Sequence, residues 1–342
     1  MDLQAIWFFL WGLLWAVFFM LDGYDLGAGA LMPVLAKSER DRRMILNASG
    51  PFWDGNEVWL ITAGGATFAA FPAAYAAMFS GLYTALMLLL FMLILRGVSF
   101  EFRGKVESAA WQRTWDWLHV ISSFVVALLL GVAFANIFRG LPLDEQGIFQ
   151  GGLLTLLNPY GLAGGVLFVV MFFLHGALWL GLRTDGELQK RSQAMAEKLW
   201  IAFAIVLVLF LAYTAVETQL FSNYLRWPVL LIVPLLAVIG LIATRTFLGS
   251  RRMWPAMGAS ALTIVAVTFF GIIGLFPALL PSRLNPGWSV TAYNSSSSEL
   301  TLTIMLVVVG IFVPIVIAYQ TWAHIMFAKP MGDEDLDHEE AY

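Results

Sequence analysis

Long apolar segments follow one another along almost the whole chain, and they restrict the possible folds more than any other feature. Of the 342 residues, 60% are hydrophobic and 12% are charged, whereas a soluble domain is roughly a quarter charged. A helix needs about 20 mostly apolar residues to cross a bilayer. The sequence therefore predicts an all-α polytopic membrane protein with nine spans, at residues 5–33, 52–72, 75–95, 115–137, 158–182, 199–218, 226–244, 255–280 and 300–327.

The basic residues indicate how these spans are oriented. With the N-terminus outside, 16 of the 19 Lys and Arg residues fall on the inner side, and only Arg139, Arg226 and Arg283 fall outside. Positive residues gather in cytoplasmic loops. We therefore expect the N-terminus outside and the C-terminus in the cytoplasm. The first segment lacks a basic n-region and a cleavage site, so it is expected to be a retained span.

The spans suggest a division into two halves. "FFMLDGYDLGAG" in span one and "MFFLHGALWLG" in span five share a faint pattern, compatible with a four-plus-four duplication and one extra helix. The expected units are a first four-helix bundle at 1–140, a second at 141–280, an external loop at 281–299, a peripheral ninth helix at 300–328 and an acidic cytoplasmic tail at 329–342. The spans two and three are expected to meet in a tight turn at "FPAAY". No loop is long enough for a nucleotide-binding or nucleic-acid-binding domain.

Acidic residues lie inside segments that otherwise suit lipid. Asp22 and Asp25 are three residues apart in the inner half of span one, so they share a helical face, and Asp54 and Glu57 repeat this spacing at the inner end of span two. A charge at the bilayer centre costs at least ~2.5–3.5 kcal/mol and normally pairs or faces a wet cavity. Arg96 and Glu101 close span three at a similar depth, so these six residues are predicted to gather and form a proton entry path from the cytoplasm.

A structural role is the alternative for these acids. An Asp–Arg pair could lock three helices together, and Asp54 in "WDGNEV" could instead stabilise a helix N-terminus. The spacing leaves both readings of Asp54 open, while relay or buried pairing is favoured for Asp22 and Asp25, which lie further from a helix end.

Metal and haem binding have little support in the sequence. The chain contains no cysteine, which excludes disulfides and thiolate metal sites. Among the four histidines only His175 lies well inside a span, and a bis-ligated haem needs a second donor at matching depth. His119 and His324 lie closer to the inner face. We therefore expect no metal site and no cofactor bound by this chain.

Several ordered motifs resemble one known family. "LDGYDLGAGAL", "PFWDGNEVWLITAGGATFAAFP", "FEFRGKVE", "GVAFANIFRG" and "LNPYGLAGGV" are similar, in this order, to subunit II of the cytochrome bd quinol oxidases, and weaker matches continue to the last helix. The "WDGNEVWLITAGGA" block is highly specific. The resemblance covers nearly the whole chain and implies two four-helix bundles plus a peripheral helix.

The resemblance also implies a function. The expected complex reduces O2 to water with electrons from quinol, and the b-type and d-type haems reside in its partner, subunit I. Asp54 matches an aspartate on a cytoplasmic proton channel, Asp25 matches another polar position on the same side, and Arg96 matches the arginine that ends span three. Trp59 matches a tryptophan that in some members marks the mouth of an oxygen tunnel through this subunit. Asp22 and Glu57 come from helical spacing alone. Some members hold a structural quinone or a small single-span accessory subunit, which no motif here places, and none has a histidine ligand at His175.

Two functions of other classes also fit the residues. Buried acids beside an arginine suit a proton-coupled secondary transporter, although no pair of broken half-helices in inverted positions is visible. In a purely structural scaffold subunit none of the acids would move a proton.

Overall fold

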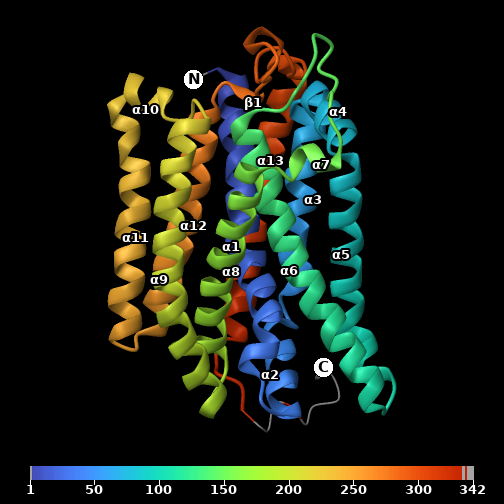
Figure 1. The fold of residues 1–342 in the computed structure, drawn as a ribbon, viewed down its shortest axis with the longest axis vertical. Helices are drawn as coiled ribbons and strands as arrows, with labels where there is room; N and C mark the ends of the chain where they lie inside the picture. The colour runs from blue at the N-terminus through green and yellow to red at the C-terminus, as the bar shows by residue number, and fades with distance from the viewer. Residues whose placement is uncertain (1, 333–335, 337–342) are drawn as a thin grey trace.

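Long, nearly parallel helices make up most of the molecule (Figure 1). The computed structural model describes residues 2–332 and residue 336. The helices are α1 (Leu3–Leu35), α2 (Glu39–Ser49), α3 (Trp53–Ala70), α4 (Pro72–Gly81), α5 (Tyr83–Phe102), α6 (Ala109–Arg139), α7 (Leu153–Leu156), α8 (Pro159–Arg183), α9 (Gly186–Glu217), α10 (Ser222–Arg226), α11 (Ile232–Gly249), α12 (Met253–Leu275) and α13 (Glu299–Met326). Short 3-10 turns lie at Arg103–Lys105, Pro228–Leu231 and Pro286–Trp288, and two short strands, β1 (Ala278–Leu280) and β2 (Val290–Thr291), pair antiparallel.

Eight of the described helices are long and apolar enough to cross a membrane, which confirms an all-α polytopic membrane protein. They are α1, α5, α6, α8, α9, α11, α12 and α13. The expected span at 52–72 forms α3, which has only 18 residues and carries the polar "WDGNE" start. It is the one expected span that is not among the eight.

The connection between α3 and α5 differs from the predicted tight turn. Residues 72–81 form the separate helix α4, which begins with Pro72 at its first turn, and α5 starts only at Tyr83. The expected start of span three at residue 75 was therefore wrong. Hydropathy could not reveal this break, because "PAAYAAMFSG" is as apolar as the spans around it.

An additional helix, α2, connects α1 to α3 across one end of the molecule (Figure 1). Ser38 caps it, accepting from the backbone N–H of Asp41, while the Asp41 carboxylate accepts from the backbone N–H of Ser38. This reciprocal cap satisfies two donors at the helix start. We call this side of the molecule the α2 end; the N-terminus, α4 and the β1–β2 pair lie at the opposite end.

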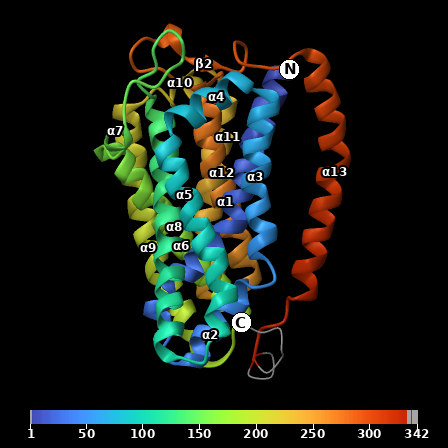
Figure 2. The ribbon, with the colours of Figure 1, turned by 90° about the vertical axis from the view of Figure 1, so that its right-hand side faces the viewer.

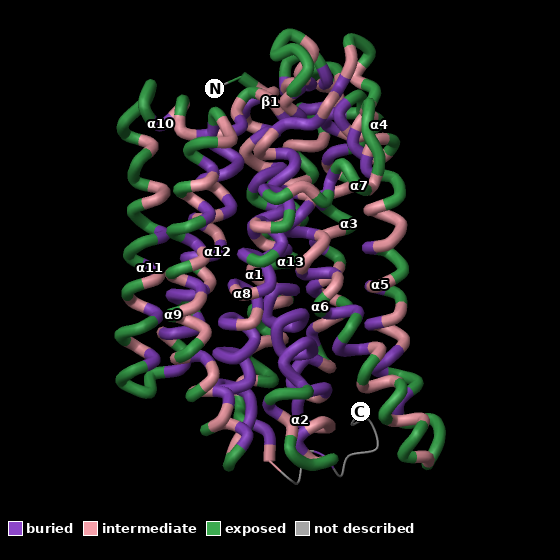
Figure 3. Tube along the Cα trace, in the orientation of Figure 1, coloured by how far each residue is buried: buried purple, intermediate pink, exposed green. Residues whose placement is uncertain are grey.

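The most deeply buried helix is α8, and α1, α6 and α12 lie beside it (Figure 3). Glycines allow α1 and α8 to touch backbone to backbone, since a Cβ at Gly27 would overlap the carbonyl oxygen of Phe172. A cluster of aromatic rings, including Phe19, Phe134 and Phe168, fills the space where α1, α6 and α8 meet. Because α6 and α8 pack closely, helices of the two predicted halves share one core, and the division at residue 140 stays a prediction.

Helix α13 lies at the periphery beside α1 and α3 (Figure 2). Leu302 is the only buried residue of this helix, and its backbone carbonyl accepts from the indole N–H of Trp7. The position agrees with the expected peripheral last helix. The predicted acidic tail at 329–342 lies largely outside the described residues.

Candidate functional site

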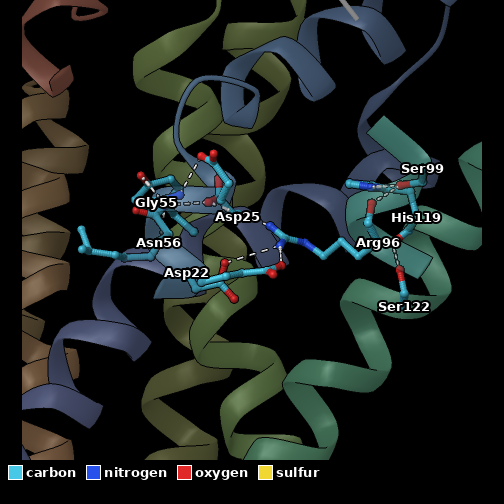
Figure 4. Close-up of polar contacts among 12 residues, drawn as sticks. Asp22, Asp25, Gly55, Asn56, Arg96, Ser99, His119 and Ser122 are labelled. Atoms are coloured by element: carbon cyan, nitrogen blue, oxygen red, sulfur yellow. Dashed lines mark hydrogen bonds and ion pairs between the residues drawn. The ribbon is translucent and has the colours of Figure 1, made fainter. Parts of the chain in front are cut away.

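A buried arginine on α5 gathers three carboxyl groups from two other helices (Figure 4). Arg96 is fully buried, and its Nη1 lies 2.6 Å from Glu57 Oε1 on α3 and 3.5 Å from Asp22 Oδ1 on α1. Its Nη2 lies 3.9 Å from Asp25 Oδ2. We call Asp22, Asp25, Glu57 and Arg96 the Arg96 cluster. The expected convergence of three helices at one depth is thus present for these four residues.

The charges in the Arg96 cluster do not balance. One guanidinium faces three carboxyl groups, and Asp22 and Asp25 are both fully buried. Within the described part of the chain, neither Asp22 oxygen has a hydrogen-bond partner. Buried charges are costly unless they are paired and hydrogen-bonded. Such a cluster therefore has an excess of groups able to exchange a proton.

Asn56 completes one side of the cluster, and sequence reasoning missed it. Its Nδ2 lies 2.6 Å from Asp25 Oδ2 and 2.8 Å from the hydroxyl oxygen of Tyr24, and the side chain is buried. The only signal was its place between Asp54 and Glu57, where an asparagine in a membrane helix needs polar partners.

His119 holds the opposite side of Arg96 (Figure 4). Ser99 Oγ donates to the carbonyl oxygen of Arg96 and lies 2.8 Å from His119 Nδ1. Since the serine proton goes to the carbonyl, the serine oxygen accepts from His119 Nδ1–H. Both His119 and Ser99 are buried, so this contact fixes the end of α5 against α6.

Two predicted members do not join the cluster. Asp54 is exposed, and its Oδ1 accepts from the backbone N–H of Gly55, as an acid in the first turn of a helix does. Glu101 is also exposed, because it lies five residues after Arg96 and so about 140° around the helix. The expected group of five acids is therefore a group of three. The proton-pathway roles of Asp54 and Glu101 stay predictions.

Trp59 is buried between α3 and α13, and its indole N–H donates to Gln320 Oε1 at 2.9 Å. It does not line the large apolar cavity of the molecule, which has a volume of about 550 Å³. Other residues of α3, α1 and α6 do, among them Leu60, Gly64, Trp11, Trp15 and Phe134.

Comparison with known proteins decides the family. A family model described as cytochrome bd terminal oxidase subunit II matches residues 3–327. The chain belongs to this family. It is 38% identical to the probable cytochrome oxidase subunit 2 of Haemophilus influenzae over 98% of this chain and 96% of that protein. It is 34% identical to the cytochrome bd ubiquinol oxidase subunit 2 of Bacillus subtilis over 98% of both chains. It is 36% identical to the cytochrome bd-I ubiquinol oxidase subunit 2 of Escherichia coli K12, over 98% and 97%.

The fold agrees with this assignment. A chain of the bd oxidase from Geobacillus thermodenitrificans superposes with a TM-score of 0.77 at 16% identity, covering 95% of this chain and 99% of that one. The chain is thus a bacterial membrane subunit of a cytochrome bd-type oxidase, which sets aside the transporter alternative.

His175, the candidate haem ligand of the sequence analysis, forms hydrogen bonds through both ring nitrogens. His175 Nδ1 lies 2.9 Å from Ser260 Oγ, and Nε2 lies 3.0 Å from the backbone carbonyl of Met20. Ring nitrogens that hold hydrogen bonds to buried groups are not open for a metal. The geometry favours a hydrogen-bonded core histidine that ties α8 to α1 and α12.

Replacing His175 by leucine is therefore expected to leave the haem spectrum of the assembled oxidase unchanged. The free energy of unfolding should fall by about 1–3 kcal/mol, because the hydroxyl of Ser260 and the carbonyl of Met20 each lose a buried partner. Redox difference spectra and thermal unfolding of the purified complex would measure both effects, with Ser260→Ala as the control. Loss of one haem band from an intact complex would instead make His175 a ligand.

Proposed function

We propose that this chain is the non-haem subunit II of a quinol:O2 oxidoreductase, that it stabilises the haem-bearing subunit I, and that it supplies a proton path. The curated relatives from Bacillus subtilis and Escherichia coli are named as ubiquinol oxidase subunits. The haems b and d would reside in subunit I, together with the site at which quinol is oxidised and O2 reduced. A small single-span accessory subunit would pack at the lipid-facing surface.

The gradient of exposure from Asp54 to Arg96 supports the proton path most directly. Asp54 is exposed, and Glu57, one turn further along α3, has a side chain that is 19% exposed and touches Arg96. Arg96, Asp22 and Asp25 are fully buried. A proton that reaches Asp54 would therefore pass through a partly exposed acid to a closed pair of acids.

Each residue of this path has a distinct task. Asp54 would take the proton at the surface of the chain, and Glu57 would pass it inward. Arg96 would keep one carboxylate of the cluster ionised, so that a proton acceptor is present. Asp22 and Asp25 would then share the arriving proton between them. Proton uptake from one side of the membrane for O2 reduction separates charge without a pumping cycle.

The direction of uptake follows from the basic residues. The Arg96 cluster lies in the half of the molecule toward the α2 end, where α2 carries Arg40, Arg42 and Arg43. Positive residues mark the cytoplasmic side. We therefore place the α2 end in the cytoplasm and the N-terminus outside, which makes the path a cytoplasmic one.

The apolar cavity supports an additional task in gas access. Its walls are formed by residues such as Trp11, Leu60, Phe79 and Phe134, and an apolar volume of this size suits an apolar gas. Trp59 is one residue from Leu60 on α3 and would limit access rather than line the volume. A structural quinone would need an apolar space of this kind as well.

Replacing Asp54 by asparagine tests the path. It keeps the size of the side chain and removes its titration, so quinol-driven O2 uptake by the assembled oxidase should fall by about 10²-fold, as for other acid–base groups. Haem spectra and subunit stoichiometry should stay as in the wild type.

Asp185→Asn is the matched control, because Asp185 is a partly exposed acid at the same end whose ion pair with Arg40 lies at the surface. An Asp54→Asn oxidase that turns over at the wild-type rate would leave subunit II as a structural scaffold.

A further inference from the structure

Helix α13 touches the rest of the chain most specifically near the α2 end. Gln320 and His324 are partly buried on a helix whose neighbouring residues are mostly exposed. Gln320 Oε1 accepts from the indole N–H of Trp59, and Gln320 Nε2 donates to the backbone carbonyl of Gly55 at 3.0 Å. The His324 ring stacks on Phe52 with a centroid separation of 4.5 Å. All three partners lie at the start of α3, beside Asp54 and Glu57.

The hydrogen-bond directions around His324 follow from what each group can donate. His324 Nδ1 lies 2.7 Å from the backbone carbonyl of Gln320, which only accepts, so Nδ1 carries the hydrogen. In the neutral ring, Nε2 is then an acceptor. It lies 3.1 Å from the hydroxyl of Tyr24, which therefore donates to it.

The Asn56 amide extends this chain of hydrogen bonds to Asp25. Since the Tyr24 hydroxyl gives its hydrogen to His324, its oxygen accepts from Asn56 Nδ2 at 2.8 Å. The second hydrogen of that amide goes to Asp25 Oδ2 at 2.6 Å. Asn56 Nδ2 also lies 3.5 Å from the backbone carbonyl oxygen of Leu21, but its two short contacts are those to Tyr24 and Asp25. A flipped Asn56 amide would turn its oxygen toward the Asp25 carboxylate, placing two acceptors face to face.

We propose that His324 and Tyr24 are positioning residues, through which α13 fixes the Asn56 amide and so holds Asp25 toward Arg96. This inference rests on the proposed proton path, because it assigns to the peripheral helix the orientation of one acid on that path. His324 touches neither Asp25 nor Arg96 and acts only through Tyr24 and Asn56.

Other charged groups also surround this chain of contacts, so the test must separate their effects. The titratable and charged groups that face Asp25 or Tyr24 are Asp22 on α1, Glu57 on α3, Arg96 on α5, Arg183 on α8 and His324 on α13. Tyr24→Phe alters none of these groups, and His324→Phe alters only His324.

Two substitutions break the chain of contacts with little change in shape. Tyr24→Phe removes only the hydroxyl, and His324→Phe keeps a ring to stack on Phe52 while removing the acceptor. His324 is partly exposed, so its variant is expected to fold. Tyr319→Phe, on an exposed tyrosine of the same helix, is the matched control. His324→Gln, which offers a new acceptor, should restore part of the wild-type behaviour.

The measurement is redox-induced infrared difference spectroscopy of the assembled oxidase over a range of pH, with the protonated-carboxyl band assigned by Asp25→Asn. Both variants are expected to move the titration of this band by about one pH unit to higher pH, because Asp25 loses an oriented donor to its ionised form. The double variant should shift no further than either single one. A band that titrates in both single variants as it does in Tyr319→Phe would overturn the proposal.

Turnover measured on the same samples separates this proposal from the proton path itself. If the band shifts while O2 uptake keeps its wild-type pH profile, the positioning role stands and the proton path fails. If Asp54→Asn abolishes uptake while the band stays in place in Tyr24→Phe and His324→Phe, the path stands and the positioning role fails.

Discussion

Replacing Arg96 by methionine is expected to prevent stable assembly of the oxidase. The guanidinium is fully buried and is the cation that faces Asp22, Asp25 and Glu57. Removing one partner of a buried ion pair costs about 3–5 kcal/mol, because the remaining charge loses its compensation. Here three acids lose the same partner. The loss is a large part of a total stability of about 5–15 kcal/mol, so the amount of assembled complex in membranes should fall sharply.

Two further variants show whether charge is the cause. Arg113→Met, at an exposed arginine near the same end, should leave assembly unchanged. Combining Arg96→Met with Asp22→Asn and Glu57→Gln should restore much of the assembly, because fewer acids then need a cation, while O2 uptake stays low. Quantitative immunoblots and haem content of membranes would measure this. Normal assembly of Arg96→Met alone would contradict the paired state of the cluster.

The sequence predicted the membrane fold well because apolar length is a direct physical requirement of a span. It did not predict α2 or α4. Helix α2 is polar and short, so the Ser38–Asp41 capping motif is the sequence feature that indicates it. Helix α4 is as apolar as a span, and it ends at Gly81, where a Cβ would come within 2.7 Å of the Phe149 side chain.

Part of the site could be predicted because buried charges also have a direct physical requirement, namely a partner. Helical spacing and depth identified Asp22, Asp25, Glu57 and Arg96, because a charge in lipid needs a partner within reach. The contact between Tyr24 and His324 joins residues 300 positions apart. Spacing along one helix carries no information about such a pair, and only the placement of α13 beside α1 and α3 brings it together.

Helix α3 departs from the hydropathy rule at the residues to which we assign the proposed proton path. It has 18 residues, as α11 does, and it carries Asp54, Asn56 and Glu57 within its first turns. Natural sequences break local rules mainly at functional sites. The neighbouring helices compensate through contacts at its start, where Trp53 stacks on Phe100 of α5 and Gly55 bonds to Gln320 of α13.

Replacing Gly27 by alanine is expected to destabilise the complex through packing alone. A Cβ at this position would overlap the backbone carbonyl of Phe172, and one at Gly176 would overlap the backbone nitrogen of Ala28. Backbone atoms in the middle of two helices cannot yield as a flexible side chain can, so α1 and α8 must separate. Overpacking a tight core costs about 1–3 kcal/mol, and occasionally more.

The separation would also reach the Arg96 cluster, because Asp22 and Asp25 lie on α1 within five residues of Gly27 and the His175–Met20 contact ties α1 to α8. We therefore expect Gly27→Ala to lower the melting temperature of the complex and to reduce O2 uptake in whatever complex remains. Gly258→Ala is the matched control, since a Cβ there would meet no atom within 4 Å. Equal melting temperatures for the two variants would show that α1 and α8 do not pack as closely as their glycines indicate.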